Sequence, residues 1–172
     1  FYIAPITDTK RNITGATLGT ALGSNNVTIQ TVASANPTVT GATASGSYTS
    51  GLGDIYVNDA VSWSANYTLT LNAYNSIYIN SAITATGASG KLALEYSQGT
   101  STGIYSVNGP ISLQAAVATD SSGNFSTKLG SAATTYYTVI TSLGNAGDQG
   151  RSGDTNSLQG LGHSDRLSGN YV

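Results

Sequence analysis

The stretch Ile55-Tyr56-Val57-Asn58-Asp59-Ala60-Val61-Ser62 decides the fold, because it returns 22 residues later as Ile77-Tyr78-Ile79-Asn80-Ser81-Ala82-Ile83-Thr84. A third copy, Val107-Asn108-Gly109-Pro110-Ile111-Ser112, follows Ile104-Tyr105. Between the first two copies lies Thr68-Leu69-Thr70-Leu71, which returns 23 residues later as Lys91-Leu92-Ala93-Leu94. Apolar residues at i and i+2 share one face of a strand. One motif that returns in the same order predicts a repeat architecture.

About three short strands per unit are typical of one coil of a parallel β-helix, in which each coil stacks on the last at about 4.8 Å. We therefore expect an all-β fold, a β-solenoid with about three strands per coil. An antiparallel sandwich also has short strands and Gly-rich turns, but it does not predict one motif recurring in order. The corner residues Asn58, Asn80 and Asn108 are expected to be structural. The residues expected to define the core are Ile55, Val57, Leu69, Leu71, Ile77, Ile79, Leu92 and Leu94.

We expect the 172 residues to form a single solenoid segment with a loop-rich C-terminal part. Residues 1–33 are expected to form opening rungs, and 34–52 a looser Ser/Thr/Gly-rich rung or loop. Regular rungs are expected over 53–118, and a strand-plus-loop extension over 119–172. Residues 167–172 resemble a strand just beginning, and an unpaired strand is an aggregation hazard. We therefore expect the chain to continue in a longer parent or to be covered by a neighbouring copy.

The composition argues against several partners. Only 8% of the residues are charged, the net charge is −2, and the six cationic residues are scattered. Nucleic acid requires a clustered basic surface, and anionic lipid is disfavoured for the same reason. No run of about 18 apolar residues is present, so membrane insertion is not expected. Cysteine is absent, which excludes disulfides and thiolate metal sites.

The sequence predicts no catalytic residue, no cofactor and no metal site. His163 is the single histidine, and its neighbours Ser164 and Asp165 do not form a triad, which requires convergence in space. Zinc requires several N or S ligands. Asp148, Asp154 and Asp165 lie in a Gly-rich stretch, a pattern that suggests a calcium-binding site. The nine-residue calcium-binding repeat of β-helix proteins is missing, however. A β-helix enzyme acting on polysaccharide is the least favoured alternative, because one Glu and scattered Asp residues offer no carboxylate pair.

Two groups of surface residues are candidate functional sites. Tyr56 and Tyr78 occupy equivalent outward positions, where a tyrosine column would contact carbohydrate or neighbouring rods, or would simply pack as a ladder. Asn-x-Ser/Thr sequons mark four candidate glycosylation sites: Asn12, Asn26, Asn66 and Asn124. A chain this rich in Asn, Ser and Thr contains some such sequons by chance.

Several stretches resemble the filamentous-haemagglutinin family of two-partner secretion exoproteins. Three of them look like its rungs: Gly53-Asp54-Ile55-Tyr56-Val57-Asn58, Val61-Ser62-Trp63-Ser64-Ala65-Asn66 and Thr68-Leu69-Thr70-Leu71-Asn72-Ala73. Later stretches extend the likeness from about residue 12 to the end: Phe125-Ser126-Thr127-Lys128-Leu129-Gly130, Tyr137-Thr138-Val139-Ile140-Thr141-Ser142-Leu143-Gly144, Leu158-Gln159-Gly160-Leu161 and Leu167-Ser168-Gly169-Asn170-Tyr171.

The resemblance implies a right-handed parallel β-helix that is exported through an outer-membrane secretion pore and is secreted or displayed on the bacterial cell surface. The family's amino-terminal secretion domain is not recognisable, so the expected role is a shaft segment of an adhesin that supports adhesion, aggregation or biofilm. Expected partners are a host or neighbouring-cell surface, carbohydrate, or copies of the chain itself. The alternative is a self-assembling extracellular fibre subunit whose open ends stack head to tail.

Overall fold

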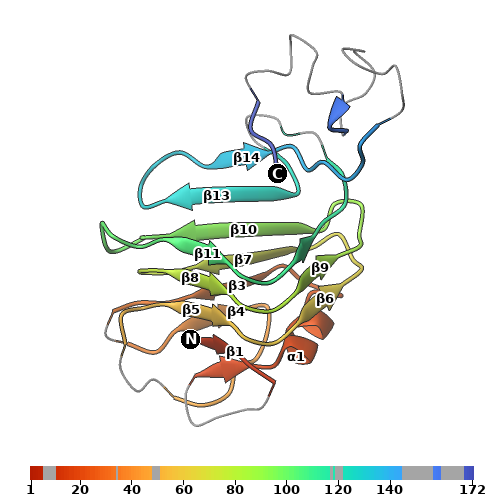
Figure 1. The fold of residues 1–172 in the computed structure, drawn as a ribbon. Coiled ribbons are helices and arrows are strands. Elements are labelled where there is room, and N and C mark those ends of the chain that lie inside the picture. Colours follow the sequence, from red (N-terminus) through yellow and green to blue (C-terminus); the bar gives the residue numbers. More distant parts are fainter. Residues whose placement is uncertain are drawn as a thin grey trace.

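The fold consists of three β-sheets and, among the described residues, one helix (Figure 1). The structure is a computed structural model that describes residues 1–5, 11–33, 35–47, 51–116, 118, 122–144, 157–159 and 169–172. We call the sheets sheet 1 (order β11-β8-β5-β1-β2), sheet 2 (β12-β9-β6) and sheet 3 (β14-β13-β10-β7-β3-β4). The prediction of a mostly β chain with parallel sheets is confirmed.

Each copy of the repeat forms one turn, which contributes one strand to each sheet. The first turn consists of β5 (Ile55–Val57), β6 (Val61–Trp63) and β7 (Thr68–Asn72). The second consists of β8 (Ile77–Ile79), β9 (Ile83–Ala85) and β10 (Lys91–Tyr96). The third consists of β11 (Tyr105–Val107), β12 (Ile111–Ser112) and β13 (Phe125–Leu129). Successive turns pair in parallel at equivalent positions of the repeat in all three sheets.

The core consists of apolar columns that run from turn to turn. Val57 lies opposite Ile79, and Ile79 opposite Val107, so the inward residues of one strand pack on those of the next. Such stacking removes apolar surface from water although no strand in the described ranges is longer than six residues. The eight residues named above as the expected core all have a relative exposure of 0%: Ile55, Val57, Leu69, Leu71, Ile77, Ile79, Leu92 and Leu94.

Helix α1 (Gly15–Ala21) covers the lower edge of sheet 2, so the all-β expectation is wrong for this segment. Thr14 is the N-cap, and its hydroxyl accepts a hydrogen bond from the Thr17 amide. Leu18 and Leu22 are four residues apart and fully buried, as expected for one face of a helix. A Cβ on Gly15 would overlap the carbonyl oxygen of Ala60, which shows how closely the helix approaches β6.

The other two sheets also depart from the regular repeat at this end. In sheet 3, β3 (Val27–Gln30) pairs with β7 in parallel and with β4 (Thr38–Thr40) antiparallel, so the parallel ladder stops there. In sheet 1, β1 (Tyr2–Ile3) pairs with β5 and with β2 (Asn12–Ile13), and Asn12 forms an antiparallel bridge with Ser45. We call this the closed end; the expected opening rungs and looser rung therefore include a helix and a reversed strand.

At the opposite end the three sheets do not stop at the same turn, and we call this difference the step. Among the described residues, sheet 1 stops at β11 and sheet 2 at β12, whereas sheet 3 continues from β13 to β14 (Thr135–Tyr137). β14 is antiparallel to β13, a second departure from the expected all-parallel stacking. Thr138 then forms a parallel bridge with Tyr171, and the Ile140 amide donates to the Val172 carbonyl at 2.8 Å, so the described end of the predicted final strand pairs with the segment after β14. We call this the open end (Figure 1).

Candidate functional site

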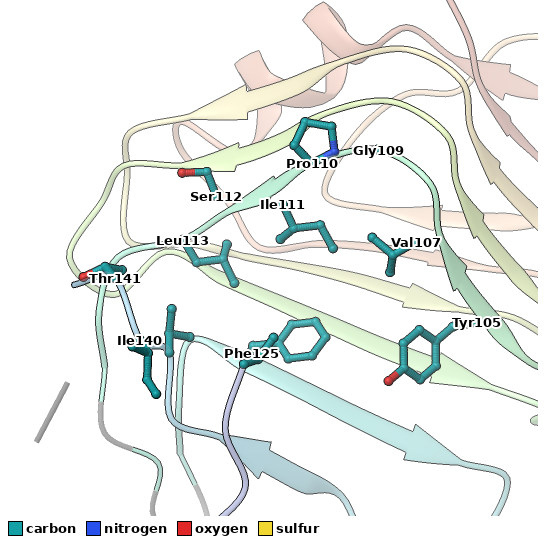
Figure 2. A pocket seen from close by; sticks show the side chains of 12 residues that line it. Tyr105, Val107, Gly109, Pro110, Ile111, Ser112, Leu113, Phe125, Ile140 and Thr141 are labelled. Carbon is teal, nitrogen blue, oxygen red and sulfur yellow. The ribbon is translucent and has the colours of Figure 1, made fainter. Parts of the chain in front are cut away.

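A cavity of about 670 Å³ lies at the open end, beside the step. One side is formed by β11, β12 and the segment between them, with Tyr105, Val107 and Ile111 projecting into the space (Figure 2). The other side is formed by Phe125 of β13 and by Ile140 from the segment after β14. The remaining lining residues are Gly109, Pro110, Ser112, Leu113, Val139, Thr141 and Val172.

Among the described residues, no further strand of sheet 1 or sheet 2 lies above the third turn, and the cavity lies over that turn. Tyr105 lies over Ile77, and Val107 lies over Ile79, so both occupy positions that are fully buried in the second turn. In the third turn Tyr105 is 36% exposed and Val107 is 46% exposed. Inward-facing residues are therefore in contact with solvent, which is costly for apolar side chains.

The lining of the cavity carries no charged side chain within the part of the chain that the structure describes. Burial raises the pKa of Tyr105, and the neighbouring tyrosines Tyr137 and Tyr96 add to this effect. Among the strands that the structure describes, β11 and β12 are edge strands of their sheets. An exposed apolar strand edge is a template for another extended chain, so the open end is suited to binding polypeptide.

The predicted tyrosine positions form a column on the outer face of sheet 1. Tyr56 stacks on Tyr78 at 5.0 Å between ring centroids, with an interplanar angle of 13°. Tyr2 extends the stack below Tyr56 at 5.1 Å and 12°. Each ring covers a face of the next, so the column offers edges and hydroxyls to a carbohydrate more than ring faces. Burial raises the pKa of Tyr56 to about 12, and the Asp54 carboxylate, which accepts a hydrogen bond from its hydroxyl at 3.2 Å, adds to the rise.

The three corner asparagines form a hydrogen-bonded ladder. The amide nitrogen of Asn80 donates to Oδ1 of Asn58 at 2.8 Å, and that of Asn108 donates to Oδ1 of Asn80 at 2.9 Å. Asn58 and Asn80 thus each accept from the asparagine of the turn above. This geometry agrees with a structural role, since the side chains bind one another.

The acidic residues that the structure describes are all bound by the chain's own groups. Asp54 accepts hydrogen bonds from the side-chain amide of Asn75 at 2.8 Å and from the Ser76 backbone at 3.0 Å. Asp59 accepts from the Gly15 backbone at 2.8 Å, which ties α1 to the first turn. Glu95 accepts from the Asn72 amide. These carboxylates stabilise corners and ladders between turns, a role that sequence reasoning did not assign to Asp54.

Two of the four candidate glycosylation sites are buried in the folded chain. Asn12 is fully buried and Asn124 is only 3% exposed, so neither side-chain amide is open to a glycosyltransferase after folding. Asn124 instead donates to the carbonyls of Ala88 and Gln114, both at 3.1 Å. Asn26 and Asn66 are exposed, and their Oδ1 atoms accept backbone hydrogen bonds from the neighbouring turn.

The candidate residues of the C-terminal part lie outside the described residues: Asp148, Asp154, His163 and Asp165. Within the described ranges, no group of three or more His, Cys, Asp or Glu side chains is placed to hold a metal ion. No helix among the described residues is long and apolar enough to cross a bilayer.

The open end itself was not predicted as a site. Its residues follow the same alternating pattern as the buried turns, so the local sequence carries no signal of their exposure. A usable signal was the longer sequence spacing of 28 residues between Asn80 and Asn108, which marks a turn unlike the one before it.

Comparison of the chain with protein-family models, with curated proteins and with solved structures found no match.

Proposed function

We propose that the chain is a structural shaft segment of a secreted bacterial surface adhesin, built as a right-handed parallel β-helix and without catalytic activity. The observation that carries the proposal is the unbroken parallel register of three consecutive turns, in which Ile55, Ile77 and Tyr105 occupy equivalent positions of one column. A rod of this kind lengthens by adding turns, and each turn contacts only its neighbours.

The outer surface supports this role. Its ladders consist of neutral residues such as Tyr56 and Tyr78, or Asn58 and Asn80, which bind copies of themselves at the spacing of adjacent strands. Columns of like charge would repel at that spacing, and only 8% of the residues are charged. The resemblance to filamentous-haemagglutinin exoproteins adds export through an outer-membrane pore, a location outside the cell, and a part in adhesion, aggregation or biofilm.

The closed end favours the shaft over the alternative of a head-to-tail fibre. Head-to-tail stacking requires a free sheet edge at both ends of the subunit. Here α1 covers β6, β4 reverses the ladder of sheet 3, and Ser45 bridges to Asn12 of sheet 1. The open end of one copy would therefore meet α1 and a reversed strand on the next copy, and not three edges in the parallel register.

Electron microscopy and sedimentation velocity of the purified chain test this choice. We expect isolated short particles and a monomeric sedimentation coefficient. Long uniform filaments would reject the shaft in favour of the fibre subunit.

Adhesion of chain-coated beads to cells tests whether the segment supports or itself makes contact. A shaft segment predicts no more adhesion than beads coated with Val57→Asp, a variant that we expect to misfold because it buries an unpaired charge. Adhesion that disappears in Tyr78→Thr, but persists in the control Thr70→Ser, would instead assign receptor binding to the tyrosine column. Cleavage of an acidic polysaccharide, lost in Asp54→Asn, would support the polysaccharide-acting enzyme.

A further inference from the structure

We propose that the open end is a docking surface for a β-arc, meaning a polypeptide segment of two short strands that are joined at an asparagine corner and carry apolar residues at alternate positions. The inference rests on the geometry of the third turn and not on the adhesin proposal. It commits to a strand-forming peptide as the occupant, because three independent features of the open end match such a segment.

The first feature is the backbone. β11 and β12 belong to the same turn, and within the described part of the chain each is the edge strand of its sheet. Along the edge that faces β8, β11 makes the hydrogen bonds of a parallel pair. The Asn108 amide donates to the Ile79 carbonyl at 2.8 Å, and the Ile77 amide donates to the Ile104 carbonyl at 2.9 Å. An arc in the same register would repeat these hydrogen bonds along the opposite edge of β11, which faces away from β8. A single strand would use only one of the two edges, whereas an arc uses both.

The second feature is the cavity. Tyr105, Val107 and Ile111 are inward positions of the repeat, and the space of about 670 Å³ above them is bordered on the far side by Phe125 and Ile140 (Figure 2). The inward residues of a docked arc, spaced like Ile77, Ile79 and Ile83, would enter this space and cover the exposed apolar surface. The uncharged lining disfavours a charged occupant.

The third feature is the asparagine corner. In each lower pair, Oδ1 of one asparagine accepts from the amide of the asparagine above, so Oδ1 of Asn108 is the next acceptor in the series. Its present partner is the Ser106 hydroxyl at a long 3.4 Å. An asparagine at the corner of the docked arc would donate to Asn108, which fixes the register of the arc.

Other occupants match fewer of these features. A lipid or a small apolar ligand would fill the cavity but leave the two strand edges and Asn108 without matching groups. The closed end of a second copy does not match the open end, because α1 covers β6, sheet 3 ends in the reversed strand β4, and Ser45 bridges to Asn12 of sheet 1. Two open ends that meet face to face would not place an asparagine of one copy in the parallel register over Asn108 of the other.

The test uses a fluorescent peptide that copies residues 76–86, the arc of the second turn, titrated with the full 172-residue chain. Fluorescence anisotropy should show saturable binding. Val107→Asp in the chain should weaken binding at least about tenfold, because it places a charge in the apolar cavity. The matched control Ser62→Asp adds the same charge to an outward position of the first turn, and it should leave the affinity unchanged. In the peptide, Asn80→Ala should weaken binding about threefold to tenfold through the lost corner hydrogen bond.

Circular dichroism and the fluorescence of Trp63 establish that each variant is folded. If Val107→Asp does not fold, Val107→Thr keeps the shape of the side chain and should weaken binding severalfold. Amide NMR shifts on adding peptide should concentrate at residues 105–113. No saturable binding up to about 1 mM peptide, or binding that Val107 variants do not change, would overturn the proposal. Dimerisation that Val107→Asp abolishes, without peptide binding, would show that a second copy is the occupant and would also overturn it.

Discussion

Truncation of two residues in the same core column, Ile79→Ala and Val107→Ala, should have very different effects on stability. Ile79 is fully buried between Val57 and Val107, and Ile→Ala changes in such sites cost about 2–5 kcal/mol. We expect about 3 kcal/mol, since the neighbouring strands hold the cavity open. Val107 is 46% exposed, so the two carbons that it loses are only about half buried and should cost about 1 kcal/mol.

Urea unfolding measures this difference, with the fluorescence of Trp63 and far-UV circular dichroism as two probes. Trp63 is the only tryptophan and is 4% exposed, so its emission reports on the first turn. Coincident transitions are required, because stacked turns can unfold separately. For a chain of this size the expected shift in Tm is roughly 6–12 °C for Ile79→Ala and 2–4 °C for Val107→Ala. Losses that agree within about 0.5 kcal/mol would refute the inference that the column ends at an uncovered third turn.

Three further predictions concern the tyrosine column, the closed end and the corner ladder. The raised pKa of Tyr56 means that the folded state holds the hydroxyl proton more tightly than the unfolded state. The stabilisation that results is complete below pH 10 and is lost as the pH rises towards 12. Between pH 9 and pH 11.5, the free energy of unfolding in urea should therefore fall less for Tyr56→Phe than for the parent chain. Gly15→Ala should lower the free energy of thermal or urea unfolding by about 1–3 kcal/mol, because the added Cβ pushes α1 away from β6. Gly51→Ala is the control and should be neutral, because open space surrounds its Cβ position. Equal effects of the two variants would refute the close approach of α1 to β6. Asn80→Ala removes both ladder hydrogen bonds at an exposed corner and should cost about 1 kcal/mol in urea unfolding, whereas no measurable change would show that the ladder is dispensable.

The regular turns were predictable because their pattern is local. Alternation places Ile55 and Val57 on one face of a strand, and the step of 22 residues places Ile77 and Ile79 on the same face of the next strand. Tyr56 follows from the same rule as an outward residue. Such inferences need only the direction of each side chain and the repeat length, both of which can be read from the order of residues.

The two ends were decided by tertiary structure. Gly15 and Gly19 lower helix propensity, yet α1 forms because Leu18 and Leu22 bury one face and the glycines allow close contact with β6. Asn12 has the sequon of an exposed site, but it lies in β2 beneath the first turn and is buried.

The repeat in the sequence by itself determined which side chains point inward, because that depends on alternation within each strand. It did not determine whether an inward side chain is buried, because burial depends on whether another layer of the structure lies above it. Val107 occupies the same position of the repeat as Val57 and Ile79, and it differs from them only in being 46% exposed at the open end.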